Sequence, residues 1–100
     1  MEYAFCDQTV TVYRMQGNAL TKIVLSGCYL EVGQGRKPEN ARPQWDFLLI
    51  VPGSEQRVFP GDLLVPGIGP EQLGPVDHPL VVGHIKSYYW EGRLAHIEAT

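Results

Sequence analysis

The stretch WDFLLIVPGSEQRVFPGDLLVPG, residues 45–67, contains three Pro-Gly pairs, at Pro52-Gly53, Pro60-Gly61 and Pro66-Gly67. Proline presets φ for the second position of a tight turn, and glycine supplies the positive φ that the third position of a type II turn requires. Each pair therefore predicts a chain reversal. The apolar, β-branched and aromatic runs between the reversals are too short for helices, so the stretch predicts a compact all-β domain.

A strand hairpin is predicted before this stretch. Residues 9–14 alternate strictly, with Val10 and Val12 on one face, and this pattern is typical of a half-buried strand. Turn-forming residues at 16–18 lead into a return strand over 20–26. Gly27 then interrupts the alternation, and the apolar positions continue in the opposite parity. This change predicts a β-bulge or bend that moves the strand from one sheet to another.

Further strands are predicted on the C-terminal side. Residues 45–51 are nearly all apolar and indicate a central strand covered on both faces. Residues 57–59 and 63–65 flank the second Pro-Gly turn and are expected to pair. Residues 80–90 form the longest strand candidate, and Glu91-Gly92 is a plausible hairpin loop into a last strand over 94–99.

Two long loops complete the expected architecture. Residues 33–44 lack apolar periodicity, and residues 66–79 are rich in proline and glycine, with one possible helical turn at 70–73. The prediction is one domain over residues 1–100. It is a small β-barrel or sandwich of seven to eight antiparallel strands with two long loops.

Composition excludes several function classes. One hundred residues suit one hydrophobic core, and no apolar run approaches the roughly 20 residues that cross a bilayer. The first residues lack the pattern of a secretory signal, so we expect a soluble protein that is not exported. The net charge of −3 disfavours a nucleic-acid binder held by phosphate contacts.

The groups that could perform catalysis are scattered. No histidine occupies a metal-ligand spacing, and although His84 and His96 could face each other, no Cys or carboxylate completes a metal set. We therefore predict no enzyme activity, no cofactor and no metal. Asp62 is interpreted as a turn residue whose carboxylate accepts local backbone N–H bonds. Cys6 and Cys28 could form one bridge, although two buried reduced thiols are favoured.

The candidate interaction residues lie in an aromatic cluster and a basic loop. Strand alternation places Tyr89 on the same face as Ile85, in the core, and leaves Tyr88 and Trp90 together on the other face. A protein interface is favoured for Tyr88 and Trp90, since aromatic residues are enriched at interfaces. In the first long loop the candidates are its basic side chains, Arg36, Lys37 and Arg42.

The order of these elements resembles a known family. An N-terminal strand over residues 7–12 is followed by a second strand through residues 27–30 and by apolar residues 47–52. A strand, Gly-Asp turn and strand over 58–67 come next, and the chain closes with residues 84–87 and a Leu-x-His ending at 94–96. This pattern is similar to small minor capsid or head-tail connector proteins of tailed phages and prophages of Gram-positive bacteria. This chain departs from the family pattern at two points. Connector proteins have an aromatic residue directly after the Leu-x-His ending, where this chain has Ile97. Their Phe-x-x-Gly-Asp motif also has one residue more between the phenylalanine and the glycine than this chain has between Phe59 and Gly61.

The resemblance implies a structural role in a virion. The chain would be a β-barrel subunit of a homo-oligomeric ring at the virion neck, made in the host cytoplasm and joined to portal, adaptor and tail proteins. The basic loop would become ordered only in the assembly, against a neighbouring subunit or packaged DNA. No membrane partner is implied.

Two other classes of function remain open from the sequence. One is a small barrel that binds single-stranded nucleic acid through Tyr88, Trp90 and nearby basic groups. The other is a small barrel enzyme or ligand-binding protein, which would need a polar pocket with perturbed ionisable groups.

Overall fold

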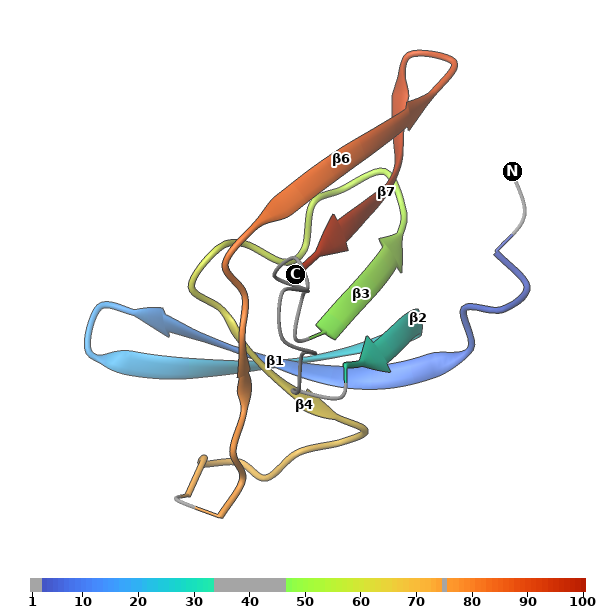
Figure 1. Cartoon of the computed structure of the whole chain (residues 1–100). Coiled ribbons are helices and arrows are strands. Elements are labelled where there is room, and N and C mark those ends of the chain that lie inside the picture. Colours follow the sequence, from blue (N-terminus) through green and yellow to red (C-terminus); the bar gives the residue numbers. More distant parts are fainter. Residues whose placement is uncertain (1–2, 34–46, 75) are drawn as a thin grey trace, which may run out of the picture.

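The computed structural model describes residues 3–33, 47–74 and 76–100, which form seven antiparallel strands and no helix (Figure 1). The strands are β1 (Gln8–Gln16), β2 (Ala19–Val32), β3 (Phe47–Pro52), β4 (Leu63–Pro66), β5 (Leu80–Val81), β6 (Ile85–Trp90) and β7 (Arg93–Ala99). The predicted all-β class and strand number are confirmed. Across these ranges there is also no helix that could cross a membrane.

The strands form one curled sheet in the order β5-β4-β1-β2-β3-β7-β6. β5 and β6 lie at opposite edges of this order, although only residues 82–84 separate them in the chain. This short connection bonds to both halves of the sheet: the Val82 N–H donates to the Asp62 carbonyl, and the Gly83 and His84 N–H groups donate to the Thr100 carbonyl. The two edges are therefore drawn together, and the sheet is a half-barrel (Figure 1).

Gly27 is the bend in β2, as predicted. The first part of β2 pairs with β1 and its last residues pair with β3. Between the pairs Gln8–Cys28 and Val10–Leu25 the register shifts by one residue, which marks a bulge on β2. Gly27 has φ of 71°, a conformation that favours glycine.

The predicted strand over residues 80–90 is divided in two. β5 pairs with β4, the chain crosses the half-barrel at residues 82–84, and β6 pairs with β7. The prediction of one unbroken strand was wrong because its two ends pair with different halves of the sheet. The longest strand is β2, with 14 residues.

β1 is buried on both faces, so the expectation of a half-buried strand was wrong. Val10 and Val12 face the core, but Thr11 and Tyr13 on the other face are also buried. The loop after β4 covers them. The Thr11 hydroxyl donates to the Gly67 carbonyl and accepts from the Gly69 N–H, and the Tyr13 hydroxyl donates to the Pro70 carbonyl.

Residues 57–59 do not form the predicted strand, and β4 pairs with β1 and β5 instead. Side chains satisfy much of the backbone here: Arg14 donates to the Arg57 carbonyl and the Asp62 carboxylate accepts from the Phe59 N–H. These bonds replace a strand ladder. The helical turn expected at residues 70–73 does not form. The start of this loop lies along β1 instead, with the Gly69 N–H bonded to Thr11 and the Pro70 carbonyl bonded to Tyr13.

Of the three Pro-Gly reversals that were predicted, the turn at Pro60-Gly61 is confirmed, because the Asp62 N–H donates to the Phe59 carbonyl at 3.1 Å. Gly53, Gly61 and Gly67 all have positive φ, at 133°, 93° and 72°. Gly53 and Gly67 form bends rather than tight turns, and their N–H groups still donate to the neighbouring strands. Residues 17–18 join β1 to β2, and Glu91-Gly92 join β6 to β7 with φ of 52° and 79°. Such two-residue loops match the right-handed twist of paired strands.

The core lies inside the curl of the sheet. Its buried members include Val10, Val12, Leu25, Phe47, Leu49, Val51, Val58, Leu64, Val82, Ile97 and Ala99. β3 is an interior strand between β2 and β7, with residues 47, 49 and 51 buried and the alternate residues half-buried, while β2 occupies the middle of the order. Trp45, which was included in the predicted central strand, lies outside the described residues.

Both cysteines are free and buried, which agrees with the favoured prediction. Burial raises the pKa of the Cys6 and Cys28 thiols, so both are held in the neutral form. Such thiols behave as small apolar core groups.

Candidate interaction surface

An aromatic row crosses the outer face of the sheet from β2 to β6. We use this name for five rings, namely Tyr29, Phe5, Tyr3, His96 and Tyr88. Successive ring centroids are 5.5, 6.5, 5.3 and 4.6 Å apart. Tyr88 and His96 are stacked at 13°, while Tyr3 meets His96 edge-on at 73°. The row attaches the segment before β1 to the β6–β7 hairpin.

His96 is the centre of this row. It is directly opposite Tyr88 in the β6–β7 ladder and is only 8% exposed, because rings cover it from both sides. The Tyr3 hydroxyl lies 2.6 Å from His96 Nδ1, and Glu98 Oε2 lies 3.2 Å from Nε2. Burial raises the pKa of the Tyr3 phenol, and the nearby Cys6 and Glu98 raise it further. The phenol is therefore neutral and serves as a hydrogen-bonding group.

The predicted interaction residues Tyr88 and Trp90 have different environments. Tyr88 is half-buried against His96, with Lys86 Nζ 5.3 Å from its ring centroid. Trp90 is 56% exposed at the end of the hairpin, opposite Arg93. Only Trp90 presents most of its ring to solvent.

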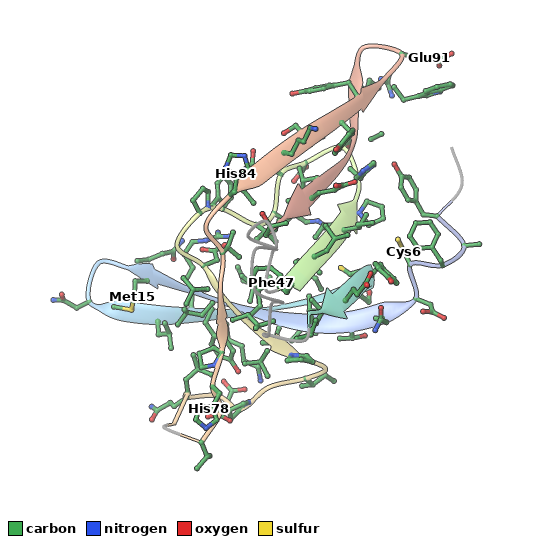
Figure 2. All side chains as sticks on the ribbon, in the orientation of Figure 1. Cys6, Met15, Phe47, His78, His84 and Glu91 are labelled. Carbon is green, nitrogen blue, oxygen red and sulfur yellow. The ribbon has the colours of Figure 1, made fainter. Side chains whose placement is uncertain are left out.

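The prediction that Tyr89 lies in the core was wrong, since its side chain is 66% exposed. Tyr89 lies on the same face of β6 as Ile85, as expected. However, the β6–β7 hairpin projects beyond the half-barrel, and Glu91 marks its far end (Figure 2). No core remains beneath the strand at Tyr89. A register shift between Tyr88 and Tyr89 adds a bulge at the same point.

An open hollow of about 460 Å³ lies beside this hairpin. It is lined by Tyr3, Trp90, Glu91, Arg93, Leu94 and Ala95. It has one acidic and one basic side chain at its rim, and it adjoins the aromatic row through Tyr3.

The basic candidates cannot be placed on this surface. Arg36, Lys37 and Arg42 lie outside the described residues. The described cations nearest to Tyr88 and Trp90 are Lys86 and Arg93.

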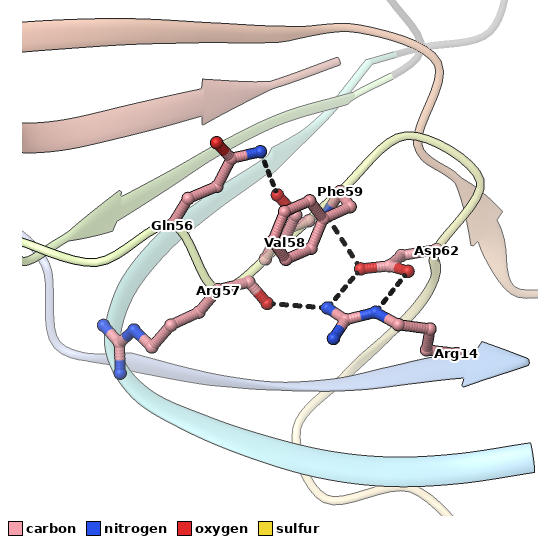
Figure 3. A network of polar contacts seen from close by, with 6 residues as sticks. All are labelled: Arg14, Gln56, Arg57, Val58, Phe59 and Asp62. Carbon is pink, nitrogen blue, oxygen red and sulfur yellow. Dashed lines mark hydrogen bonds and ion pairs between the residues drawn. The ribbon is translucent and has the colours of Figure 1, made fainter. Parts of the chain in front are cut away.

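A second polar cluster was missed by the sequence analysis (Figure 3). The Arg14 guanidinium donates to both Asp62 carboxylate oxygens, at 2.9 and 2.8 Å, and to the Arg57 carbonyl at 3.0 Å. Asp62 is only 3% exposed and also accepts from the Phe59 N–H. The hydrogen bonds and the negative charge of Asp62 raise the pKa of Arg14. We call the Arg14–Asp62 pair with its backbone partners the arginine latch.

The latch explains the Pro60-Gly61-Asp62 turn. The predicted role of Asp62 as a local acceptor is confirmed, but nothing in the sequence spacing links it to Arg14. The Arg14 guanidinium also lies over the Phe59 ring, 4.7 Å from its centroid, and both side chains line a hollow of about 450 Å³ together with Met15 and Leu20. A bidentate, backbone-bonded ion pair of this kind fixes a turn against a strand.

The histidines are dispersed. His84 lies opposite Thr100, whereas His96 lies opposite Tyr88, so the two do not face each other. His78 lies in the loop between β4 and β5, apart from His84 in space although the two are close in the sequence (Figure 2). Within residues 3–33, 47–74 and 76–100, no three His, Cys, Asp or Glu side chains gather closely enough to hold a metal ion.

The chain has no match among known proteins in three comparisons: no family model matches it, and no curated protein or solved structure shows significant similarity.

Proposed function

We propose that this chain is a structural virion protein of a tailed phage or prophage, acting as a ring subunit that joins head and tail. The proposal combines the resemblance of residues 7–12, 47–52, 58–67 and 94–96 to connector proteins with the surface of the fold. In this role portal, adaptor and tail proteins are its partners, and Arg36, Lys37 and Arg42 contact a neighbouring subunit or packaged DNA.

The supporting observation is where the exposed apolar side chains lie. Met15 is 61% exposed near the end of the β1–β2 hairpin, and Trp90 is 56% exposed at the end of the β6–β7 hairpin. Ile68 and Val76, at 75% and 83% exposed, lie in the loop between β4 and β5. Single exposed apolar residues are common, and others, such as Val24 and Val81, lie on strands, but these four lie on two hairpin ends and one long loop. Such elements suit docking into an assembly.

The arginine latch and the aromatic row suit the same role. Each ties a segment outside the strands to the sheet: the latch holds the turn at Asp62 to β1, and the row holds Tyr3 and Phe5 to the β6–β7 hairpin. A connector subunit carries load between head and tail, so its projecting parts need firm attachment.

The gene neighbourhood provides the first test. We expect adjacent genes for portal, capsid and tail-tube proteins, and neighbours devoted to metabolism would overturn the proposal. The second test is deletion of the gene from the phage or prophage. We expect filled heads and free tails to accumulate unjoined in electron micrographs, with rescue by the wild-type gene. Normal joined particles from the deletion strain would contradict the proposed role.

A matched pair of variants separates docking from folding. Ile68→Lys with Val76→Lys places two charges on the exposed loop and is expected to prevent rescue while leaving the unfolding midpoint unchanged. Ile68→Ala with Val76→Ala keeps the loop uncharged and is expected to rescue at least in part. Equal rescue by both variants would show that this loop is not a docking element.

Single-stranded nucleic-acid binding is the alternative. Trp90 lies opposite Arg93 and leaves a ring open to stacking, which favours this reading, whereas one face of Tyr88 is already occupied by His96. Binding of an oligonucleotide that weakens with salt and is lost in Trp90→Ala would support it. Absence of binding at low salt would remove it.

A further inference from the structure

β6 is an edge strand with an open side. His84 and Thr100 exchange two backbone hydrogen bonds, each at 3.0 Å, and so form a hydrogen-bonded pair of the antiparallel ladder. Such pairs alternate with non-hydrogen-bonded pairs along a strand. The residues of β6 whose backbone bonds to β7 are therefore those at 86, 88 and 90. The N–H and C=O groups of Ile85, Ser87 and Tyr89 therefore point away from β7. Among the described residues, no backbone group pairs with them.

This edge has little of the protection that edge strands normally carry. The opposite edge, β5, has two residues, while β6 has six. Proteins usually guard long edges with prolines or several charges, because open backbone groups recruit another strand. β6 has no proline and one charge, Lys86. Its Ser87 and Tyr89 side chains are exposed.

We propose that β6 pairs with β6 of a second copy of this chain, antiparallel, about a two-fold axis at Ser87. In this register Ser87 lies opposite Ser87 of the second copy, and Ile85 lies opposite Tyr89. All three outward-pointing positions are then used, which gives about six hydrogen bonds between the copies. No other register uses all three.

The side chains favour the same register. On one face Ile85 packs against Tyr89 of the second copy, twice, and apolar-aromatic pairs of this kind stabilise sheets. This contact would cover the exposed Tyr89 ring. On the other face Lys86 lies opposite Tyr88 of the second copy, where cation-π attraction is available. A register shifted by one residue along each strand would set the two Lys86 side chains against each other, and like charges directly opposite are unfavourable.

The pairing concerns the isolated chain and does not rest on the connector proposal. A strand-to-strand contact buries less surface than a standard interface, so we expect a weak, concentration-dependent dimer. Analytical ultracentrifugation over a wide range of protein concentration measures this equilibrium.

Ser87→Pro is the decisive variant. The Ser87 N–H points away from β7, so proline removes no bond from the chain's own ladder, but it removes a donor from each side of the dimer. We expect the dissociation constant to rise at least about tenfold. Ser87→Ala keeps the N–H and is expected to dimerise like the wild type. A urea unfolding curve of each variant checks that the fold persists.

Cysteine cross-linking tests the register without proline. Opposed residues of a hydrogen-bonded pair have Cα atoms roughly 5.5 Å apart, within reach of a disulfide. Ser87→Cys should therefore form a disulfide-linked dimer on mild oxidation, whereas Lys86→Cys should form far less. A monomeric wild type at high concentration, an unchanged dimer in Ser87→Pro, or equal cross-linking of the two cysteine variants would each overturn the proposal.

Discussion

The two hairpins of this protein, β1–β2 and β6–β7, are alike locally and differ in what covers them. Each closes with a two-residue loop and continues the sheet. β1 is buried on both faces because the loop after β4 lies over Thr11 and Tyr13 and because the arginine latch holds the next turn. The end of the β1–β2 hairpin is exposed too, at Met15 and Leu20, but β6 has no buried residue at any point of its length, and Tyr89 and Trp90 are exposed.

The difference teaches that burial of a strand depends on the segments that return over it. In a strand whose apolar and polar residues alternate, the sequence alone makes one face apolar. The second face becomes buried only where a distant loop offers hydrogen-bond partners for its polar groups, as residues 67–70 do for Thr11 and Tyr13. Substitutions around β1 are therefore expected to cost more stability than substitutions at the β6–β7 end.

Loss of the latch carboxylate is expected to have the largest effect. Asp62→Ala leaves the Arg14 guanidinium and the Phe59 N–H without their partner in a largely buried place. Breaking a buried pair costs about 3–5 kcal/mol, and because the Arg14 side chain is 23% exposed, we expect about 3 kcal/mol. Urea unfolding measures the loss.

A surface ion pair provides the matched control for the latch. Lys22 Nζ lies 3.0 Å from Glu71 Oε1, and the Glu71 side chain is 87% exposed. Glu71→Gln is expected to cost less than about 1 kcal/mol. Equal losses for Asp62→Ala and Glu71→Gln would show that the latch contributes no more than an exposed pair.

The cover over β1 can be broken at Gly69. A Cβ atom there would collide with the Tyr13 hydroxyl, which would have to leave its bond to the Pro70 carbonyl. Overpacking of this kind costs about 1–3 kcal/mol, and we expect about 2 kcal/mol for Gly69→Ala by urea unfolding. Gly74→Ala is the control, because its Cβ would meet only ordinary contacts. A harmless Gly69→Ala would mean that the loop does not hold β1.

The aromatic row is expected to be intermediate. Tyr3→Phe keeps the ring packing and removes the hydroxyl next to His96, at a cost of about 1 kcal/mol. Tyr29→Phe removes an exposed bond to Glu31 and should cost less. The thermal unfolding midpoints of the two variants measure the difference. A larger loss in Tyr29→Phe would contradict the central position of His96.

The smallest effect on stability is expected at the hairpin end. Trp90→Ala removes a ring that is 56% exposed, and surface substitutions usually change stability by less than about 0.5 kcal/mol. The same urea experiment measures it. A loss comparable to that of Gly69→Ala would show that Trp90 is part of the folded body and would erase the contrast between the hairpins.

Local features of the fold were predictable from the sequence. The positive φ at Gly53, Gly61 and Gly67, the Gly27 bulge and the Glu91-Gly92 loop depend on glycine chemistry and on apolar alternation, and both act within a few residues. The all-β class follows from the same signals. The role of Asp62 as a turn acceptor was also predictable, because that bond spans three residues.

The candidate site was only partly predictable. Trp90 was expected at a surface and is exposed there, but Tyr88 is stacked on His96 and Tyr89 lies outside the core. These outcomes depend on where the hairpin leaves the half-barrel, which no local pattern records. The aromatic row also needs Tyr3, which is 93 residues from His96 in the chain.

The sequence by itself determined where the chain turns, because proline and glycine restrict or release the backbone at their own positions. Only the tertiary structure decided which strands pair, which faces are covered, and that Arg14 and Asp62, 48 residues apart, form one latch. The physical reason is that these contacts join distant segments, whose meeting depends on the curl of the whole sheet. The open edge of β6 is a result of the same curl, since residues 82–84 carry the chain from one edge of the sheet to the other.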